Sequence, residues 1–103
     1  MSDVLKGDEA ESEIPTKEQI SDEPVYVISV AAKLVGLPAW TLRVLDEQGI
    51  VSPKRTEKNR RLYSDRDIVR LARVRSLTEV EGVNMNGVRL ILKIEENRDS
   101  EEL

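Results

Sequence analysis

The stretch that decides the fold of this 103-residue chain is residues 30–64, VAAKLVGLPAWTLRVLDEQGIVSPKRTEKNRRLYS. Its first half predicts two short helices, because apolar residues recur at helical spacing on both sides of Gly36. Gly36 is expected to end the first helix. Pro38 suits the first turn of the second helix, where its missing N–H would be unpaired anyway. Two short helices joined by so tight a connection indicate a helix-turn-helix.

Single residues predict where these two helices begin and end. Ser29 is expected to cap the first helix, after an extended lead-in over Val25–Ile28 whose residues are β-branched or aromatic. The second helix is expected to run to Gln48, and Gly49 is expected to close it as a C-terminal cap.

The second half of the stretch predicts a basic hairpin, or wing, beside the second helix. Ile50–Val51 and Leu62–Tyr63 are short apolar edges that flank the polar stretch Thr56–Asn59. Five positive charges against the single acid Glu57 fall between positions 54 and 61, a local electrostatic footprint for phosphate. The alternative is a solvated charged loop.

Two further helices are expected after the hairpin. Ser64 can cap a third helix that ends near Glu81–Gly82, and Asn84 can cap a fourth that ends near Asn97. The apolar stripe of the fourth helix, which can pack against the third helix or form a dimer face, comprises Val88, Ile91, Leu92 and Ile94. The predicted fold class is therefore mainly α, a winged helix-turn-helix with a small β wing and about four helices.

The foldable domain is expected to span residues 25–97. Residues 1–24 are acidic and lack lasting hydrophobic periodicity, which predicts a disordered tail, and residues 98–103 are expected to fray. The acidic tail has two open interpretations: a solubilising appendage, or an internal mimic of DNA that competes for the basic surface.

The charge and the composition of the chain exclude several classes of function. The net charge is −4, and it divides into −6 over residues 1–24, +4 over residues 25–82 and −2 over the remainder. The chain has no cysteine and no histidine, so thiol catalysis, disulfides, thiolate zinc sites and the usual general base are excluded. We expect no enzyme, no metal and no cofactor. Without a long apolar run or a signal peptide, the sequence predicts a soluble cytoplasmic protein with no membrane partner.

The second helix is the predicted recognition helix, because such a helix enters the major groove with its N-terminal residues toward the bases. Its core side is taken by Leu42 and Leu45, and Asp46 is expected at the edge of the groove. The candidate DNA contacts on this helix are Ala39, Trp40, Thr41 and Arg43. Arg43 can contact phosphate or guanine, and Thr41 can contact phosphate or a thymine methyl.

Two of these side chains have alternative interpretations. Arg43 can instead form an ion pair with Glu47, four residues further on. Trp40 can instead pack its ring over the small core.

The wing supplies the second set of candidate DNA contacts: Lys54, Arg55, Lys58, Arg60, Arg61, Tyr63 and, at the start of the next helix, Arg66. Alternation along a strand separates Arg60 from Arg61, and Arg61 is assigned to the DNA. Tyr63 is expected either in the core with its hydroxyl outward or as a phosphate donor. Arg66, Arg70 and Arg73 share a helix face that either extends the phosphate track or is merely solvated.

Several of these strings resemble the N-terminal DNA-binding domain of MerR-family regulators. They are Val30–Ala32, Gly36–Arg43, Asp46–Pro53, Lys54–Thr56 and Asn59–Ser64. Two more, Tyr26–Ala32 and Glu81–Asn84, are similar to the heat-shock repressor branch of that family. The resemblance matches Thr41 and Arg43 to the recognition-helix motif and Arg61 to the wing arginine. It departs at Val44 and Leu45, where the family usually has aromatic residues, one of which can contact phosphate.

The resemblance implies a bacterial, nucleoid-associated regulator that binds an inverted repeat in double-stranded DNA as a homodimer. The heat-shock branch further implies repression of chaperone genes, with a DnaK-type chaperone as corepressor. No metal or drug sensor is expected, because no long dimerisation helix or effector domain follows the fourth helix. The residues leave two other functions open: an excisionase-like architectural factor, and a protein-interaction module without specific DNA binding.

Overall fold

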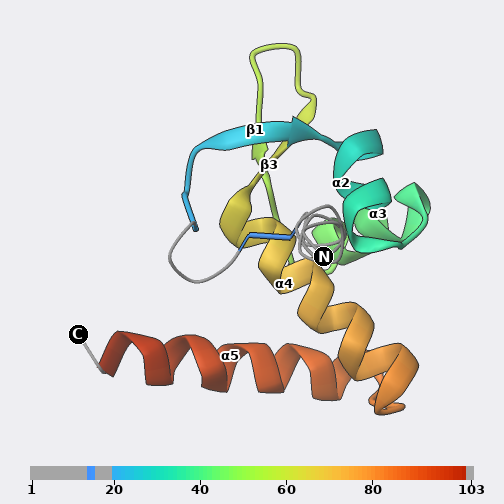
Figure 1. Ribbon diagram of the computed structural model, residues 1–103, viewed down its shortest axis with the longest axis vertical. Helices are drawn as coiled ribbons and strands as arrows, with labels where there is room; N and C mark the ends of the chain where they lie inside the picture. Colours follow the sequence, from blue (N-terminus) through green and yellow to red (C-terminus); the bar gives the residue numbers. More distant parts are fainter. Residues whose placement is uncertain (1–13, 16–19, 102–103) are drawn as a thin grey trace, which may run out of the picture.

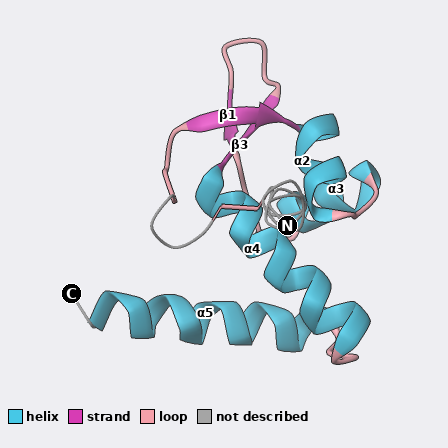
Figure 2. Cartoon of the chain, in the orientation of Figure 1, coloured by secondary structure: helices cyan, strands magenta, loops and turns pink. Residues whose placement is uncertain are grey.

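The computed structural model describes residues 14–15 and 20–101 of the chain. The elements in chain order are β1 (Pro24–Val27), α2 (Ile28–Val35), α3 (Ala39–Glu47), β2 (Lys54–Arg55), β3 (Arg61–Ser64), α4 (Asp65–Arg75), the π-helical turn η2 (Ser76–Val80) and α5 (Met85–Glu101). A small sheet lies at one end, with α2 and α3 beside it, while α4 leads away from the sheet to α5 (Figures 1 and 2). The predicted fold class, mainly α with a β wing, is confirmed.

The helix-turn-helix forms as the glycine pattern predicts. Gly36 adopts a left-handed conformation (φ 74°), and its N–H donates to the carbonyl oxygen of Ala32, which ends α2. Gly49 is also left-handed (φ 71°) and follows the end of α3. The predicted cap at Ser29 is wrong, because β1 runs directly into α2 and Val27 stands at the N-cap without a side-chain hydrogen bond. Pro38 is the N-cap of α3 and thus lies one residue before its first turn.

The wing is an antiparallel hairpin, but its first strand begins later than predicted. Ile50 and Val51 do not form a strand, because their N–H groups donate to the carbonyl of Leu45 at the end of α3. The hairpin instead pairs Lys54–Arg55 with the start of β3. The predicted lead-in, β1, pairs with the other side of β3 and gives the sheet order β1-β3-β2.

Both later helices have the predicted side-chain caps. Ser64 and Asp67 form a capping box at the start of α4, and the N–H of Gly87 donates to Asn84 Oδ1 at 2.9 Å. The helix α5 continues to Glu101, so its predicted end near Asn97 is early. Of the predicted disordered tail, residues 1–13 and 16–19 lie outside the described residues.

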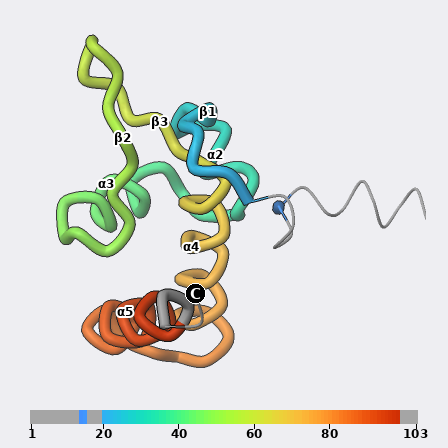
Figure 3. Tube along the Cα trace, turned by 90° about the vertical axis from the view of Figure 1, so that its left-hand side faces the viewer, coloured from blue at the N-terminus to red at the C-terminus, as the bar shows by residue number. Residues whose placement is uncertain are grey.

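The core takes buried side chains from every helix and from β3, but none from the exposed strand β2. The largest fully buried side chains are Tyr63, Leu42, Leu45, Ile68, Leu71, Val35, Val51, Val74 and Val88. Val88 and Leu92 are buried in this core, so this part of the stripe serves core packing, whereas Ile94 is 51% exposed. The C-terminal helix α5 closes the end of the core that lies away from the wing (Figure 3). Leu42 and Leu45 anchor α3 in this core.

Candidate DNA interface

The helix α3 has one buried face and one exposed face. Leu42 and Leu45 are fully buried, whereas Arg43 is exposed and Trp40 is 64% exposed. The interpretation of Trp40 as a ring packed over the core is therefore wrong. Within the described part of the chain Arg43 takes part in no ion pair, so the suggested pair with Glu47 is absent. Ala39 and Thr41 are half-buried at the same end of the helix.

The tip of the wing is a tight turn over Thr56–Asn59. The N–H of Thr56 donates to Arg60 O at 2.9 Å, and the N–H of Asn59 donates to Thr56 O at 2.8 Å. Asn59 has a positive φ of 63°, which asparagine tolerates better than most residues. The turn exposes Lys58 and Arg60 to solvent.

One carboxylate joins the recognition helix to the wing. Oδ2 of Asp46, near the end of α3, accepts from Arg55 Nη2 at 2.8 Å and from Arg61 Nε at 2.7 Å. The Asp46 side chain is only 12% exposed and that of Arg61 only 18%. Sequence analysis missed this bridge, because Asp46 was expected at the edge of the groove and its partners lie in a separate element. The sequence does contain a signal for this bridge, because an acid, Asp46, stands in the last turn of α3 and the hairpin that follows carries the two arginines Arg55 and Arg61.

Tyr63 belongs to the core and not to the candidate interface. Its side chain is fully buried, and its hydroxyl is the one buried side-chain polar atom among the described residues that has no hydrogen-bond partner. Burial raises the pKa of Tyr63 to about 12. The core interpretation is therefore correct, while the outward hydroxyl and the proposed contact to phosphate are wrong.

The basic face of α4 is engaged within the molecule. Arg70 and Arg73 form ion pairs with Glu96 and Glu95, which tie α4 to α5. Arg66 pairs with Asp22 at 2.6 Å. Each of these three arginines is thus paired with an acid in this structure. Lys54 lies on the exposed strand β2, close to Arg66.

These features define a class of protein: a helix-turn-helix with an exposed arginine on its second helix and a basic wing beside it binds DNA. The sequence profile of the MerR HTH family of regulatory proteins matches residues 26–94. The chain therefore belongs to the MerR HTH family of regulatory proteins.

Relatives and solved structures agree with this assignment. The chain is 50% identical over 78 residues to the putative heat shock protein HspR of Streptomyces coelicolor, a match that covers 76% of this chain and 52% of that protein. It is 35% identical over 82 residues to the transcriptional regulator GlnR of Bacillus anthracis, covering 80% and 63%. The fold is similar to HiNmlR, a MerR family regulator lacking the sensor domain, solved bound to promoter DNA (TM-score 0.62, 25% identity, covering 68% and 53%). This chain thus spans between half and two thirds of the length of these proteins.

Two features are absent from the described residues. No single helix there is long and apolar enough to cross a membrane, and α2 and α3 reach that length and composition only together, across a bend of 106°. The same residues contain no group of three or more side chains that could hold a metal ion.

Proposed function

We propose that this chain represses transcription as a homodimer bound to an inverted repeat in double-stranded DNA, with chaperone genes as its targets. The observation that carries the proposal is the exposed face of α3, with Trp40 and Arg43, beside a basic wing. The half-identical relative named for heat shock supports the targets, and the MerR regulator bound to promoter DNA supports the partner. The proposal entails a location in the bacterial cytoplasm, on the nucleoid.

In this proposal α3 enters the major groove and the wing follows the neighbouring backbone. The proposed contacts on α3 are Ala39, Trp40, Thr41 and Arg43. The proposed contacts on and beside the wing are Lys54, Arg55, Lys58, Arg60, Arg61 and Arg66. Arg43, Lys58 and Arg60 are exposed and offer their full charge, whereas Arg55 and Arg61 share theirs with Asp46.

Dimerisation is proposed to use α5. Leu90 and Ile94 are 59% and 51% exposed and lie four residues apart, on one face of the helix. That face is distinct from the one on which Val88 and Leu92 enter the core. A two-fold dimer would place its recognition helices about 34 Å apart, or a multiple of that distance, along the DNA.

The testing experiment is selection of bound duplexes from a random pool by the purified protein, with Arg43→Ala as the matched control. An enriched inverted repeat that occurs upstream of chaperone genes supports the proposal, and reporter expression that rises on deletion of the protein supports repression. Enriched direct repeats with strong bending would instead indicate an excisionase-like factor. Absence of duplex binding even at low salt would indicate a protein-interaction module.

A DnaK-type chaperone is proposed as corepressor. Adding the purified chaperone to the selected duplex and the protein tests this step. A tighter or slower-dissociating complex supports it, and unchanged binding contradicts it.

A further inference from the structure

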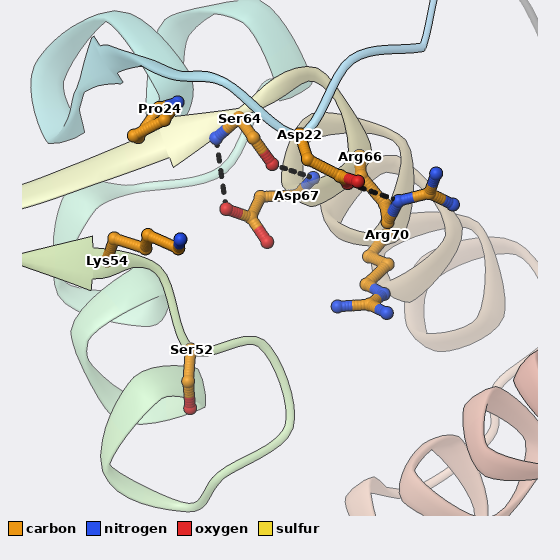
Figure 4. A pocket seen from close by; sticks show the side chains of 8 residues that line it. All are labelled: Asp22, Pro24, Ser52, Lys54, Ser64, Arg66, Asp67 and Arg70. Carbon is orange, nitrogen blue, oxygen red and sulfur yellow. Dashed lines mark hydrogen bonds and ion pairs between the residues drawn. The ribbon is translucent and has the colours of Figure 1, made fainter.

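The described part of the acidic N-terminal segment is held against α4 at a basic pocket. The pocket has a volume of about 370 Å³ and lies between the base of the wing and the start of α4 (Figure 4). Its lining residues are Asp22, Pro24, Ser52, Lys54, Ser64, Arg66, Asp67 and Arg70. Three cations, Lys54, Arg66 and Arg70, therefore line this pocket, and the acids that line it are Asp22 and Asp67.

Two polar contacts hold the segment on Arg66. The carbonyl oxygen of Ser21 accepts from the backbone N–H of Arg66 at 3.2 Å, and Asp22 Oδ1 accepts from Arg66 Nε at 2.6 Å. The nearby guanidinium groups of Arg66 and Arg70 and the ammonium group of Lys54 lower the pKa of Asp22, so this carboxylate stays charged.

Apolar side chains add a second kind of contact. Ile14 is half-buried and packs against the core. Ile20 is half-buried and lines a hollow of about 210 Å³ together with Val69 of α4 and Leu92 of α5. Apolar contacts of Ile14 and Ile20, together with the ion pair of Asp22, therefore hold the N-terminal segment against the domain.

The charged residues at this pocket differ in their partners. The carboxylate of Asp67 accepts from the N–H of Ser64 in the capping box. The guanidinium of Arg70 forms an ion pair with Glu96. Lys54 forms no ion pair with any described residue. Asp22 is thus the acid that neutralises Arg66. Both residues line the same pocket as Lys54, which belongs to β2, the first strand of the wing.

We propose that Asp22 occupies a binding position for a DNA backbone phosphate at Arg66 and Lys54, so that the N-terminal segment competes with DNA and lowers its affinity. The inference rests on the proposed DNA binding. A phosphate oxygen competes with Asp22 Oδ1 for the Nε–H donor of Arg66, and the paired carboxylate offsets the charge that attracts a phosphate. Residues 1–24, with their net charge of −6, would also repel the duplex while the segment is seated there.

The test measures affinity for the selected duplex at low and at moderate salt with full-length variants. Asp22→Asn is expected to bind about two- to fivefold more tightly at low salt, because it removes one exposed ion pair, and the gain should shrink as salt screens the charges. Glu23→Gln is the matched control: it removes the same charge one residue further on, from an exposed side chain without an ion pair to any described residue.

Arg66→Gln supplies the second arm. This variant is expected to bind DNA more weakly. When Asp22→Asn is added to Arg66→Gln, the gain in DNA affinity should be no larger than the gain that Glu23→Gln produces. Equal effects of Asp22→Asn and Glu23→Gln, or a gain that persists without Arg66, overturn the competition while leaving DNA binding intact. Failure of the unmodified protein to bind any duplex overturns the proposed function itself, which is a different result.

Discussion

The recognition helix and the wing are held in place by different forces. The helix α3 is fixed by Leu42 and Leu45, which are fully buried. Both residues of β2 are exposed, and the wing is joined to α3 through Asp46 and two arginines. Burying a leucine contributes about 1.5–3 kcal/mol, whereas in a largely buried ion pair such as Asp46–Arg61 the desolvation cost offsets much of the Coulombic attraction.

Because of this difference, the two parts of the proposed DNA interface, α3 and the wing, should respond differently to salt. Salt does not screen apolar burial as it screens charges, so the position of α3 should not loosen as salt rises. Ion pairs weaken as salt rises, so the angle of the wing is the adjustable part. The same arginines that fix the wing are those proposed to meet DNA.

The largest expected effect comes from the anchor of α3. Leu42→Ala should lower the free energy of unfolding by about 2–5 kcal/mol, because it removes buried methyl groups and leaves a cavity. Urea denaturation measures this change. Trp40→Ala, on the exposed face of the same helix, is the control and should change stability by less than about 1 kcal/mol. If the two variants are equally unstable, burial does not set the position of α3.

The next effect concerns DNA contact and not stability. Arg43→Ala should weaken binding of the selected duplex by about 1–3 kcal/mol and reduce the slope of log affinity against log salt by about one. Its folding stability should be unchanged, because Arg43 is exposed. Arg61→Ala should also reduce the slope, but it releases Asp46 as well and should therefore lower stability. A normal salt slope in either variant removes that arginine from the interface.

The base of the wing offers a test that depends on pH. Tyr63→Phe should raise stability by about 1 kcal/mol at neutral pH, because the buried hydroxyl it removes has no hydrogen-bond partner among the described residues. The pKa of Tyr63 is raised to about 12, above the ordinary value of 10.0, so its contribution to stability is complete below pH 10 and is lost as pH rises toward 12.

Denaturation of both proteins between pH 8 and 12 measures this dependence. The phenylalanine variant should lose less stability over the alkaline range, and its DNA affinity should equal that of the parent. Weaker DNA binding by the variant would restore Tyr63 as a phosphate contact.

The smallest expected effect is at the link between the two regions. Asp46→Asn should lower stability by about 1 kcal/mol or less and speed hydrogen exchange several-fold at the amide of Thr56, which closes the tip of the wing. The effect should fade at high salt. Glu47→Gln, the neighbouring exposed acid on α3, is the matched control. Unchanged exchange in Asp46→Asn would mean that the wing is held by its own hydrogen bonds.

Local signals predicted the helices well. Gly36, Ser64 and Asn84 act on backbone groups within a turn of themselves, so their effects are visible in a single sequence. The same holds for the apolar spacing that placed Leu42 and Leu45 in the core. The start of the wing was missed because Ile50–Val51 has the composition of a strand, while its N–H groups are used to close α3.

Local patterns in the sequence are sufficient to predict the winged helix-turn-helix and the concentration of positive charge beside its second helix. The pairing of the charges depends on the folded chain: Asp46 contacts arginines 9 and 15 residues away, Arg73 contacts Glu95 at a separation of 22, and Arg66 contacts Asp22 at a separation of 44. The tertiary structure likewise decided that β1 joins the sheet and that Tyr63 is buried. Caps and helical spacing act between neighbours along the chain, whereas ion pairs and strand pairing depend on the path of the whole backbone through space.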